Sequence, residues 1–336
     1  MRGVSTFPTA MPSLSLNDIQ LPIQADLERF EQTFRSSMRT KVPLLDKIMY
    51  YIVQRKGKQM RPMFVFFSAK LGGTVNESTY RGAALIELLH TATLMHDDVV
   101  DDSYERRGFF SLNALWKNKI AVLAGDFLLS RGLLLAIEND DFYSLKLLSQ
   151  TVRDMSEGEL LQIERSRRLN LDENVYFEII RQKTASLIAA ACSVGFATTN
   201  NNSELHQQTW KLGEQIGMAF QIKDDLFDFG DGKNTGKPQG TDLKEKKLTL
   251  PIIYTLNKAS NSDRRNMIYT IKNESNNKQK SAEIIDFVWK SGGIEYAKEV
   301  MHRYRAQALD ILGSFPDNEG RRGLEQLIWF TTERQK

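Results

Sequence analysis

The sequence contains 336 residues, of which 45 are Lys or Arg and 42 are Asp or Glu, giving a formal net charge of +3. This balance excludes the strongly basic surface of a dedicated nucleic-acid binder, and a single cysteine, Cys192, excludes an internal disulfide framework or a multi-cysteine zinc site. Only 8 Pro and 21 Gly residues favour long helices over strands and turns.

The N-terminal stretch contains Ser, Thr and Pro and no acidic residue before Asp18. That composition is faintly like a transit peptide, but one Arg and no clear amphipathic pattern favour a disordered leader, which we assign to residues 1–19. A targeting segment is the alternative. No signal-peptide core is present, and the lone cysteine fits a reducing compartment, so we expect a cytoplasmic protein.

Most of the remaining chain has apolar residues at three- and four-residue spacing, which predicts amphipathic helices. The predicted helices, in chain order, cover 26–38, 45–55, 80–101, 120–138, 145–165, 175–199, 205–229, 250–258, 281–290, 294–312 and 323–332. We find no alternating strand pattern of useful length. The expected fold is all-α: a single large antiparallel helical bundle around a central cavity, formed by residues 20–336.

Two stretches are apolar enough to raise the question of a membrane span. Ser, Thr, Gly and three successive Asn residues interrupt 185–203, while Asp126 and Arg131 interrupt 120–137. We therefore expect no transmembrane helix. The small residues of 185–203 instead predict a close helix–helix contact, and those at 189–195 are also compatible with a dimer interface.

Two acidic clusters dominate the chemistry that the sequence suggests. Each follows an apolar predicted helix and places carboxylates one helical turn apart. Their members are Asp97, Asp98 and Asp101 in the first cluster and Asp224, Asp225 and Asp228 in the second. A solvated acidic helix end would explain either cluster alone. Because the clusters are far apart in sequence, they can meet only through the tertiary fold.

Paired oxygen ligands with few His and no Cys nearby suit Mg²⁺ that shares its coordination with substrate phosphates. A diphosphate ester also needs cationic side chains. Candidate cations lie around both clusters: Lys58, Arg61, Arg106, Arg107, Lys183, Lys237 and Lys247. Any one of them, taken alone, is more often a solvated surface residue.

At these residues the sequence resembles the trans-isoprenyl (polyprenyl) diphosphate synthases of the long-chain type, over about residues 20–330. Five blocks occur in the family's order: GKQMRP at 57–62, HDDVVDDSYERRG at 96–108, KT at 183–184, FQIKDDLFD at 220–228 and GKPQGTDLKEKKLTLP at 236–251. The resemblance implies a prenyltransferase that extends an allylic diphosphate, such as farnesyl diphosphate, with isopentenyl diphosphate in a head-to-tail trans condensation. It also implies about three Mg²⁺ ions per active site and a homodimer.

The same resemblance implies roles for individual residues. The six aspartates would bind the metal ions or support their ligands, with Asp97, Asp101 and Asp224 foremost. The allylic diphosphate would contact Arg106, Lys183, Lys237, Lys247 and Gln221, and isopentenyl diphosphate would contact Lys58, Arg61, His90 and Arg107. Thr184 and Gln221 would direct oxygen dipoles at the developing cation. A buried structural histidine is the alternative for His90.

Product length is expected to depend on the residues that precede the first aspartate cluster. If the product runs along that helix, positions four, five and eight before Asp97 line its path, namely Thr93, Ala92 and Leu89. Short-chain members of the family tend to place aromatic rings at the two upper positions, which are small here. Because a helical turn rises about 5.4 Å, a bulky residue one turn below the aspartates would stop the chain early, so the small residues here predict a long product. The resemblance implies about thirty to fifty carbons and use as a quinone side chain. Packing of Ala92 and Thr93 against a neighbouring helix is the alternative.

Two rival functions share parts of this pattern. A class I terpene cyclase uses a similar helical fold, but it needs no second diphosphate site, against which Lys58, Arg61 and Arg107 argue. A non-catalytic partner subunit could lose one aspartate cluster, whereas this chain retains both. We expect no nucleic-acid partner and at most transient membrane contact during product release.

Overall fold

The computed structural model describes residues 15–54, 57–101, 105–106, 109–168, 172–230 and 240–334. The first helices are α1 (Leu16–Gln20), α2 (Gln24–Ser37), α3 (Pro43–Val53), α4 (Met60–Gly72), α5 (Glu77–Val100), α6 (Leu112–Trp116), α7 (Asn118–Ile137) and α8 (Phe142–Arg168). They are followed by α9 (Glu173–Ile180), α10 (Ser186–Ala197), α11 (Ser203–Phe227), α12 (Thr241–Lys244), α13 (Leu250–Lys258), α14 (Asn261–Asn273), α15 (Lys278–Lys290), α16 (Gly293–Gly313) and α17 (Glu319–Glu333). A 3₁₀ turn, η1 (Leu21–Ile23), follows α1, and a π-helix, η2 (Arg181–Ala185), joins α9 to α10.

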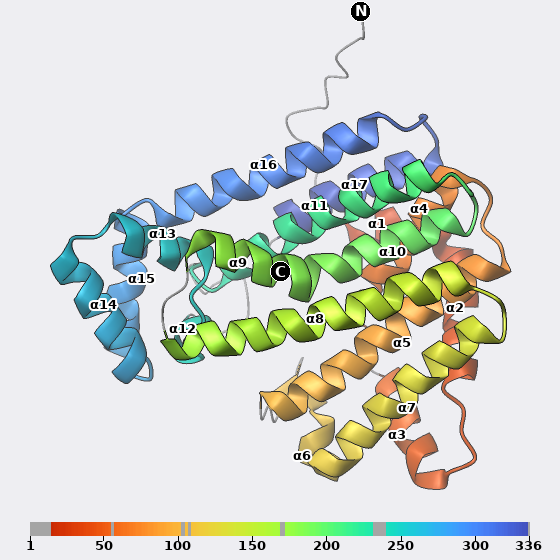
Figure 1. The fold of residues 1–336 in the computed structure, drawn as a ribbon, viewed down its shortest axis with the longest axis horizontal. Coiled ribbons are helices and arrows are strands. Elements are labelled where there is room, and N and C mark those ends of the chain that lie inside the picture. Colours follow the sequence, from red (N-terminus) through yellow and green to blue (C-terminus); the bar gives the residue numbers. More distant parts are fainter. Residues whose placement is uncertain are drawn as a thin grey trace, which may run out of the picture.

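The long helices run roughly along one direction and pack in layers, as the predicted all-α bundle requires (Figure 1). Within the described residues the sole strand pairing is an antiparallel hairpin of two-residue strands, β1 (Glu105–Arg106) and β2 (Phe109–Phe110). Helix α5 packs against α7, α10 packs against both α4 and α11, and α11 packs against α16. The two helices that end in aspartate clusters, α5 and α11, therefore both contact α10.

Helices α4 and α10 form the centre of the bundle because they are apolar on every side. Phe64, Val65, Phe66 and Phe67 of α4 are all buried, as is every residue from Ser186 to Phe196 in α10. A helix that is buried all round shows no amphipathic period. This explains why the sequence pattern did not predict α4, although the breaks on either side of it were recognised.

Small residues let the central helices approach each other closely. A Cβ atom at Gly195 would lie 2.2 Å from the Val65 carbonyl oxygen, so only glycine permits this crossing of α10 and α4. The close contact predicted for 185–203 is confirmed, but 189–195 is buried within the chain. These residues therefore cannot form the dimer interface with which the sequence was compatible.

Other predictions differ from the structure in local ways. Helix α14 is polar over much of its surface, and its weak apolar period was not recognised. The helix predicted for 175–199 is interrupted by η2. The leader predicted for 1–19 ends too late, because Ser15 caps α1 through a capping box with Asp18, and Ile19 is fully buried. Residues 1–14 lie outside the described part of the chain.

Helix α7 lies at one edge of the bundle and carries an unusual number of exposed apolar side chains (Figure 1). An 18-residue window within Leu112–Ile137 has a mean hydropathy of 1.9, which by length and composition alone is enough to cross a membrane. About a third of that window is buried in the chain. Asp126 is solvent-exposed, and Arg131 donates to the Ser37 carbonyl oxygen at 2.8 Å.

Candidate active site

The first aspartate cluster occupies the C-terminal end of α5. Asn76 begins this helix with a capping box, and the Asp101 amide closes it by donating to the Asp97 carbonyl oxygen at 2.8 Å. Asp98 is buried, and Asn113 donates to its backbone carbonyl oxygen at 3.0 Å. Asp97 is partly exposed and Asp101 is exposed. The cluster thus presents two accessible carboxylates one turn apart, on a helix end that Asn113 anchors.

The second cluster occupies the C-terminal end of α11. Asp224 is partly exposed, whereas Asp225 is buried. The Asp228 side chain accepts a hydrogen bond from the Asp242 amide at 3.2 Å, which fixes the start of α12 beside the cluster. Asp242 lines the same pocket as Asp225 and was not singled out in the sequence. Its place in the matched 236–251 block was the signal that could have identified it.

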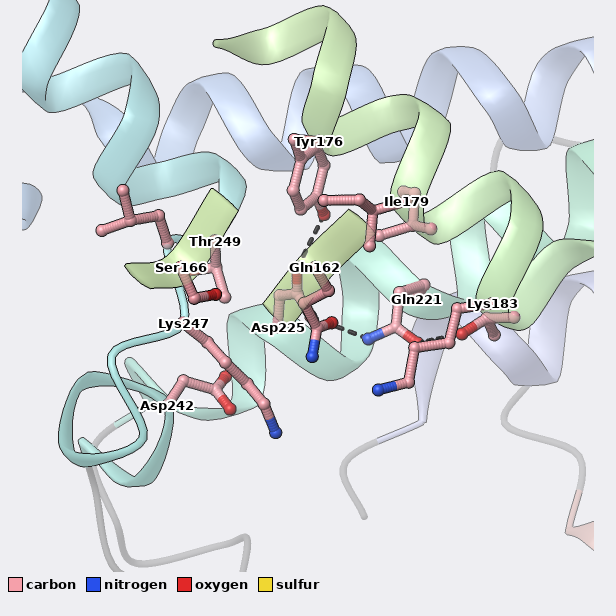
Figure 2. Close-up of a pocket in the computed structure, with 13 residues that line it drawn as sticks. Gln162, Ser166, Tyr176, Ile179, Lys183, Gln221, Asp225, Asp242, Lys247 and Thr249 are labelled. Atoms are coloured by element: carbon pink, nitrogen blue, oxygen red, sulfur yellow. Dashed lines mark hydrogen bonds between the residues drawn. The ribbon is translucent and has the colours of Figure 1, made fainter. Parts of the chain in front are cut away.

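A partly open pocket of about 220 Å³ lies beside the second cluster (Figure 2). Asp242 and Lys247 lie on one side of it, Lys183 and Gln221 lie on the other, and Asp225 and Tyr176 lie between them. Four of the residues that the sequence predicted to act on the allylic diphosphate or as metal ligands therefore converge here: Asp225, Lys183, Gln221 and Lys247.

Lys247 links the two aspartate clusters electrostatically. Burial lowers the pKa of Lys247, but an ion pair with Glu245 and the charges of Asp242 and Asp101 outweigh that effect and raise the pKa overall. Asp101 belongs to the first cluster, and Asp242 acts in turn on Asp225 of the second. Lys247 thus shares a pocket with Asp225, at the end of α11, and also feels the charge of Asp101, at the end of α5.

Asp225 has an unusual environment for a carboxylate. Burial and the nearby charge of Asp242 raise its pKa well above the ordinary range, although hydrogen bonds from Tyr176 and Gln221 oppose the shift. The Tyr176 hydroxyl donates to Oδ2 at 2.6 Å, and the Gln221 amide donates to Oδ1 at 2.8 Å. Both carboxylate oxygens are therefore engaged by protein donors.

The π-helix η2 places Lys183 and Thr184 in the pocket. Helix α8 approaches η2 so closely that a Cβ atom at Gly158 would lie 3.1 Å from the Lys183 backbone nitrogen. The next residue of α8, Glu159, forms an ion pair with Lys183, and Thr184 donates to Gln221 Oε1 at 2.7 Å. Short π segments are frequent at functional sites because they shift the direction of neighbouring side chains. Neither Glu159 nor Tyr176 was singled out in the sequence.

The cations predicted for isopentenyl diphosphate lie at the N-terminal end of α4 and on α5. Gln59 precedes α4 with φ +51°, and Lys58 and Arg61 flank this turn. The Lys58 ammonium lies 5.9 Å from the centre of the Phe330 ring on α17. His90 is buried on α5. An N-terminal helix end with two cations is favourable for a phosphate group.

One turn beyond Phe330, Arg334 reaches the second cluster. It forms an ion pair with Asp224 while its guanidinium lies 4.1 Å from the Phe220 ring centre and 5.4 Å from that of Phe227. Its side chain is only 8% exposed, and burial lowers its pKa. No sequence pattern indicated this contact, because Arg334 is one of several charged residues near the C-terminus.

Comparison with known proteins identifies the family to which the chain belongs. The family model described as polyprenyl synthetase matches residues 42–288. The chain belongs to the polyprenyl synthetase family. It is 31% identical over 312 residues to a protein of Bacillus subtilis named heptaprenyl diphosphate synthase component 2, covering 92% of this chain and 88% of the relative.

Solved structures of polyprenyl synthases share the fold closely. A decaprenyl diphosphate synthase from Rhodobacter capsulatus superposes with a TM-score of 0.91 at 30% identity, covering 96% of this chain and all of the other. A polyprenyl synthase from Caulobacter crescentus, described as complexed with calcium and isoprenyl diphosphate, gives a TM-score of 0.89 at 31% identity, with 97% and 100% covered. The resemblance read from the five sequence blocks is thus confirmed, and the chain is a prenyltransferase of this family.

Several of the predicted site residues are not tested by the structure. Arg107 and Lys237 lie outside the described residues, and the Arg106 side chain is not described although its backbone lies in β1. Of the predicted chain-length residues, Leu89 and Ala92 are buried. Thr93 is partly exposed, and its hydroxyl donates to the His90 carbonyl oxygen at 2.9 Å.

The ion pair between Arg334 and Asp224 should affect how tightly this protein binds a metal ion. Because Arg334 pairs with Asp224, any metal ion that bound this carboxylate would compete with the guanidinium. We expect Arg334→Ala to bind Mn²⁺ about threefold to tenfold more tightly than the unchanged protein in the absence of diphosphate, measured by electron paramagnetic resonance of free Mn²⁺.

Arg322→Ala is the matched control. Arg322 is on α17, and the substitution removes its exposed ion pair with Asp317, which precedes that helix. Its Mn²⁺ affinity should stay unchanged. Equal affinities in all three proteins would show that Arg334 does not compete with the metal.

Proposed function

We propose that this protein is a magnesium-dependent, long-chain polyprenyl diphosphate synthase that acts in the cytoplasm as a homodimer. It adds isopentenyl diphosphate to an allylic diphosphate such as farnesyl diphosphate and makes a prenyl chain for a quinone. The observation that carries the proposal is that Lys247 lines the same pocket as Asp225 of the second cluster, while the charge of Asp101 of the first cluster also acts on it. This arrangement gathers cations and carboxylates where a metal–diphosphate would bind.

The donor set fits Mg²⁺ on chemical grounds. The candidates are all carboxylate oxygens, and Mg²⁺ usually takes one or two carboxylates together with substrate phosphates and waters. Within the described residues, no group of three or more His, Cys, Asp or Glu side chains is arranged to hold an ion. Asp97, Asp101 and Asp224 are at least partly exposed and would contribute the carboxylates. Asp228 is also partly exposed, but one of its oxygens accepts from the Asp242 amide. Bound Mg²⁺ would stabilise the negative charge of the leaving diphosphate.

The protein's own cations act on the same diphosphate. Lys183 and Lys247 both line the pocket, and each forms an ion pair, with Glu159 and Glu245 respectively. These ion pairs limit the motion of the two ammonium groups before a diphosphate binds. As the carbon–oxygen bond breaks, its electron pair leaves with the diphosphate and an allylic carbocation remains. The double bond of isopentenyl diphosphate then attacks this cation, and loss of a proton restores a neutral chain.

Thr184 and Gln221 are oriented for a separate task. Gln221 Oε1 accepts one hydrogen bond from Thr184, and a carbonyl oxygen has a second lone pair that can face the cation. Lys58 and Arg61, the cations proposed to bind isopentenyl diphosphate, lie at the N-terminal end of α4. Lys58 is next to Phe330 of α17, and Arg334, just beyond that helix, pairs with Asp224. This relation supports two diphosphate sites rather than the single site of a terpene cyclase.

We expect Asp97→Ala and Asp224→Ala each to reduce the rate of condensation by about two orders of magnitude or more, because each removes a carboxylate that holds the metal. The measurement is incorporation of labelled isopentenyl diphosphate by purified protein at saturating Mg²⁺. Asp310→Ala, an exposed aspartate on α16, is the control and should keep full activity. Normal turnover in either cluster variant would contradict the metal assignment.

The small residues Ala92 and Thr93, one turn before Asp97 on α5, support a long product. Thr93 is partly exposed, so a larger side chain there can enter a product path without overpacking the core, whereas Ala92 is fully buried near Leu128 of α7. Both Ala92→Phe and Thr93→Phe should shorten the product. We expect the first also to lower stability by about 1–3 kcal/mol.

Chromatography of the products formed from farnesyl diphosphate and labelled isopentenyl diphosphate tests this expectation. Thr91→Phe, on another face of α5, is the control and should leave the product unchanged. An unchanged product distribution in Thr93→Phe and Ala92→Phe would show that these positions only pack against neighbouring helices.

The exposed stripe on α7 supports the homodimer. Its large apolar members recur on one side of the helix, and Phe142 continues the stripe at the start of α8. The stripe consists of Val122, Leu123, Leu133, Leu134, Ile137 and Phe142, which are between 39% and 64% exposed. So much exposed apolar surface on one helix calls for a partner. A second copy is the occupant we propose, because both copies would bring the same apolar stripe to a two-fold interface.

Leu123→Lys should convert the dimer to a monomer, because it places a charge at the most exposed apolar position of this stripe. Light scattering coupled to size-exclusion chromatography measures the mass. Leu21→Lys changes an equally exposed leucine outside the stripe and should remain dimeric. An unchanged mass for Leu123→Lys would refute this interface. The Bacillus relative is named as one component of a synthase, so a monomeric unchanged protein would instead favour an unlike partner.

A further inference from the structure

A continuous row of hydrogen bonds crosses the wall of the pocket, from Tyr176 through Asp225 and Gln221 to Thr184 (Figure 2). Its three links measure 2.6, 2.8 and 2.7 Å. Tyr176 comes from α9, Asp225 and Gln221 from successive turns of α11, and Thr184 from η2. The row therefore joins three elements at the place where the reacting carbon would lie.

Each donor in the row has a defined direction. Gln221 donates through Nε2 to a carboxylate and accepts through Oε1 from a hydroxyl. If the amide turned over, Oε1 would face the carboxylate and that bond would be lost, and the Thr184 hydroxyl would have to accept instead of donate. The orientation of Gln221 thus depends on the orientation of Asp225. Tyr176 in turn holds the second oxygen of Asp225.

Burial makes this dependence strong. Tyr176 is 3% exposed and Asp225 is 6% exposed, so water cannot readily replace a lost hydroxyl donor. The charge of Asp242 acts on Asp225 as well, and it would favour movement of the carboxylate away if the Tyr176 bond were removed. Tyr176 itself packs edge-on against Phe177, with ring centres 5.5 Å apart, which limits its own motion.

We propose that Tyr176 is a positioning residue for the condensation. Acting through Asp225, it sets the direction of the Gln221 amide and the Thr184 hydroxyl and thereby the oxygen dipoles that face the allylic cation. In this role Asp225 serves mainly as the centre of the row, and Asp224 is the carboxylate that meets the metal. This inference rests on the proposed condensation and adds a residue that the family resemblance did not supply.

The molecule offers a close control for the loss of one hydroxyl group. Tyr80 on α5 is 7% exposed, and its hydroxyl donates to Asp26 Oδ1 at 2.8 Å. This is also a bond from a buried tyrosine to an aspartate, although Asp26 is partly exposed, and it lies between α5 and α2, away from the pocket. Tyr176→Phe and Tyr80→Phe should therefore cost similar stability, which thermal unfolding measures.

Steady-state kinetics then separate positioning from folding. We expect Tyr176→Phe to lower kcat about tenfold, with the KM values for both diphosphates within about twofold of the unchanged protein. Tyr80→Phe should keep the kcat of the unchanged protein. Equal kcat values in the two variants would overturn the proposal, whether both are high or both are low.

A double-mutant cycle tests whether Tyr176 acts through the row. Thr184→Val removes the donor at the other end, so Tyr176→Phe should reduce kcat little further in that background. Tyr80→Phe combined with Thr184→Val should show no coupling. Independent, multiplicative losses for Tyr176→Phe and Thr184→Val would contradict a role through Gln221.

The same measurements distinguish this inference from the proposed function. If the unchanged protein forms no prenyl product from isopentenyl diphosphate, the proposed function itself fails. If the unchanged protein is active and Tyr176→Phe matches it, only the positioning role fails.

Discussion

Carboxylates from α11 and α12 meet lysines in a partly enclosed pocket, and much of the structure follows from that electrostatic constraint. Asp225 and Asp242 would repel each other if left without cations, and Lys247, on which Asp101 also acts, lines the same pocket. Glu159 and Glu245 in turn hold Lys183 and Lys247 in place. Like charges kept close in this way cost folding energy, and a magnesium–diphosphate is the ligand that would relieve it.

The bundle must be rigid to hold such a site, and its rigidity comes from the central helices. Helices α4 and α10 cross without an intervening side chain at Gly195, so the contact leaves little freedom. Helices α5 and α11 both pack against α10, and each ends at the pocket. The π-helix η2 is the exception within this regular packing, and it is the element that carries Lys183 and Thr184.

Two features outside the hydrophobic core bear on function: the contact of Arg334 with Asp224 and the exposed apolar stripe of α7. Arg334 folds back to pair with Asp224 between two phenylalanine rings, so the C-terminal end of α17 belongs to the site rather than to the surface. The apolar stripe of α7 has no equivalent cover within the described part of the chain. We propose that a metal ion and diphosphate compete with Arg334 for Asp224 and that a second copy of the chain covers the apolar stripe.

The amino-acid sequence by itself determined the helical class, the two aspartate clusters and the chemistry of their ligands, because these depend on local spacing and side-chain type. It also determined the family, through five blocks in a fixed order. It did not reveal α4, because a helix buried on every side has no period, nor η2, because one extra residue in a helical turn leaves no pattern. It did not single out Tyr176, Glu159, Asp242 or Arg334 either.

These residues acquire their roles only through contacts between distant elements. A tyrosine two turns before Lys183 looks like any core residue until α9 brings its hydroxyl to a carboxylate on α11. The small residues of 189–195 could have faced a partner, and only the tertiary fold turned them inward against α4. Local spacing fixes which chemical groups the chain offers; packing decides which of them meet, because charge and hydrogen bonding act over a few ångströms in space and not along the sequence.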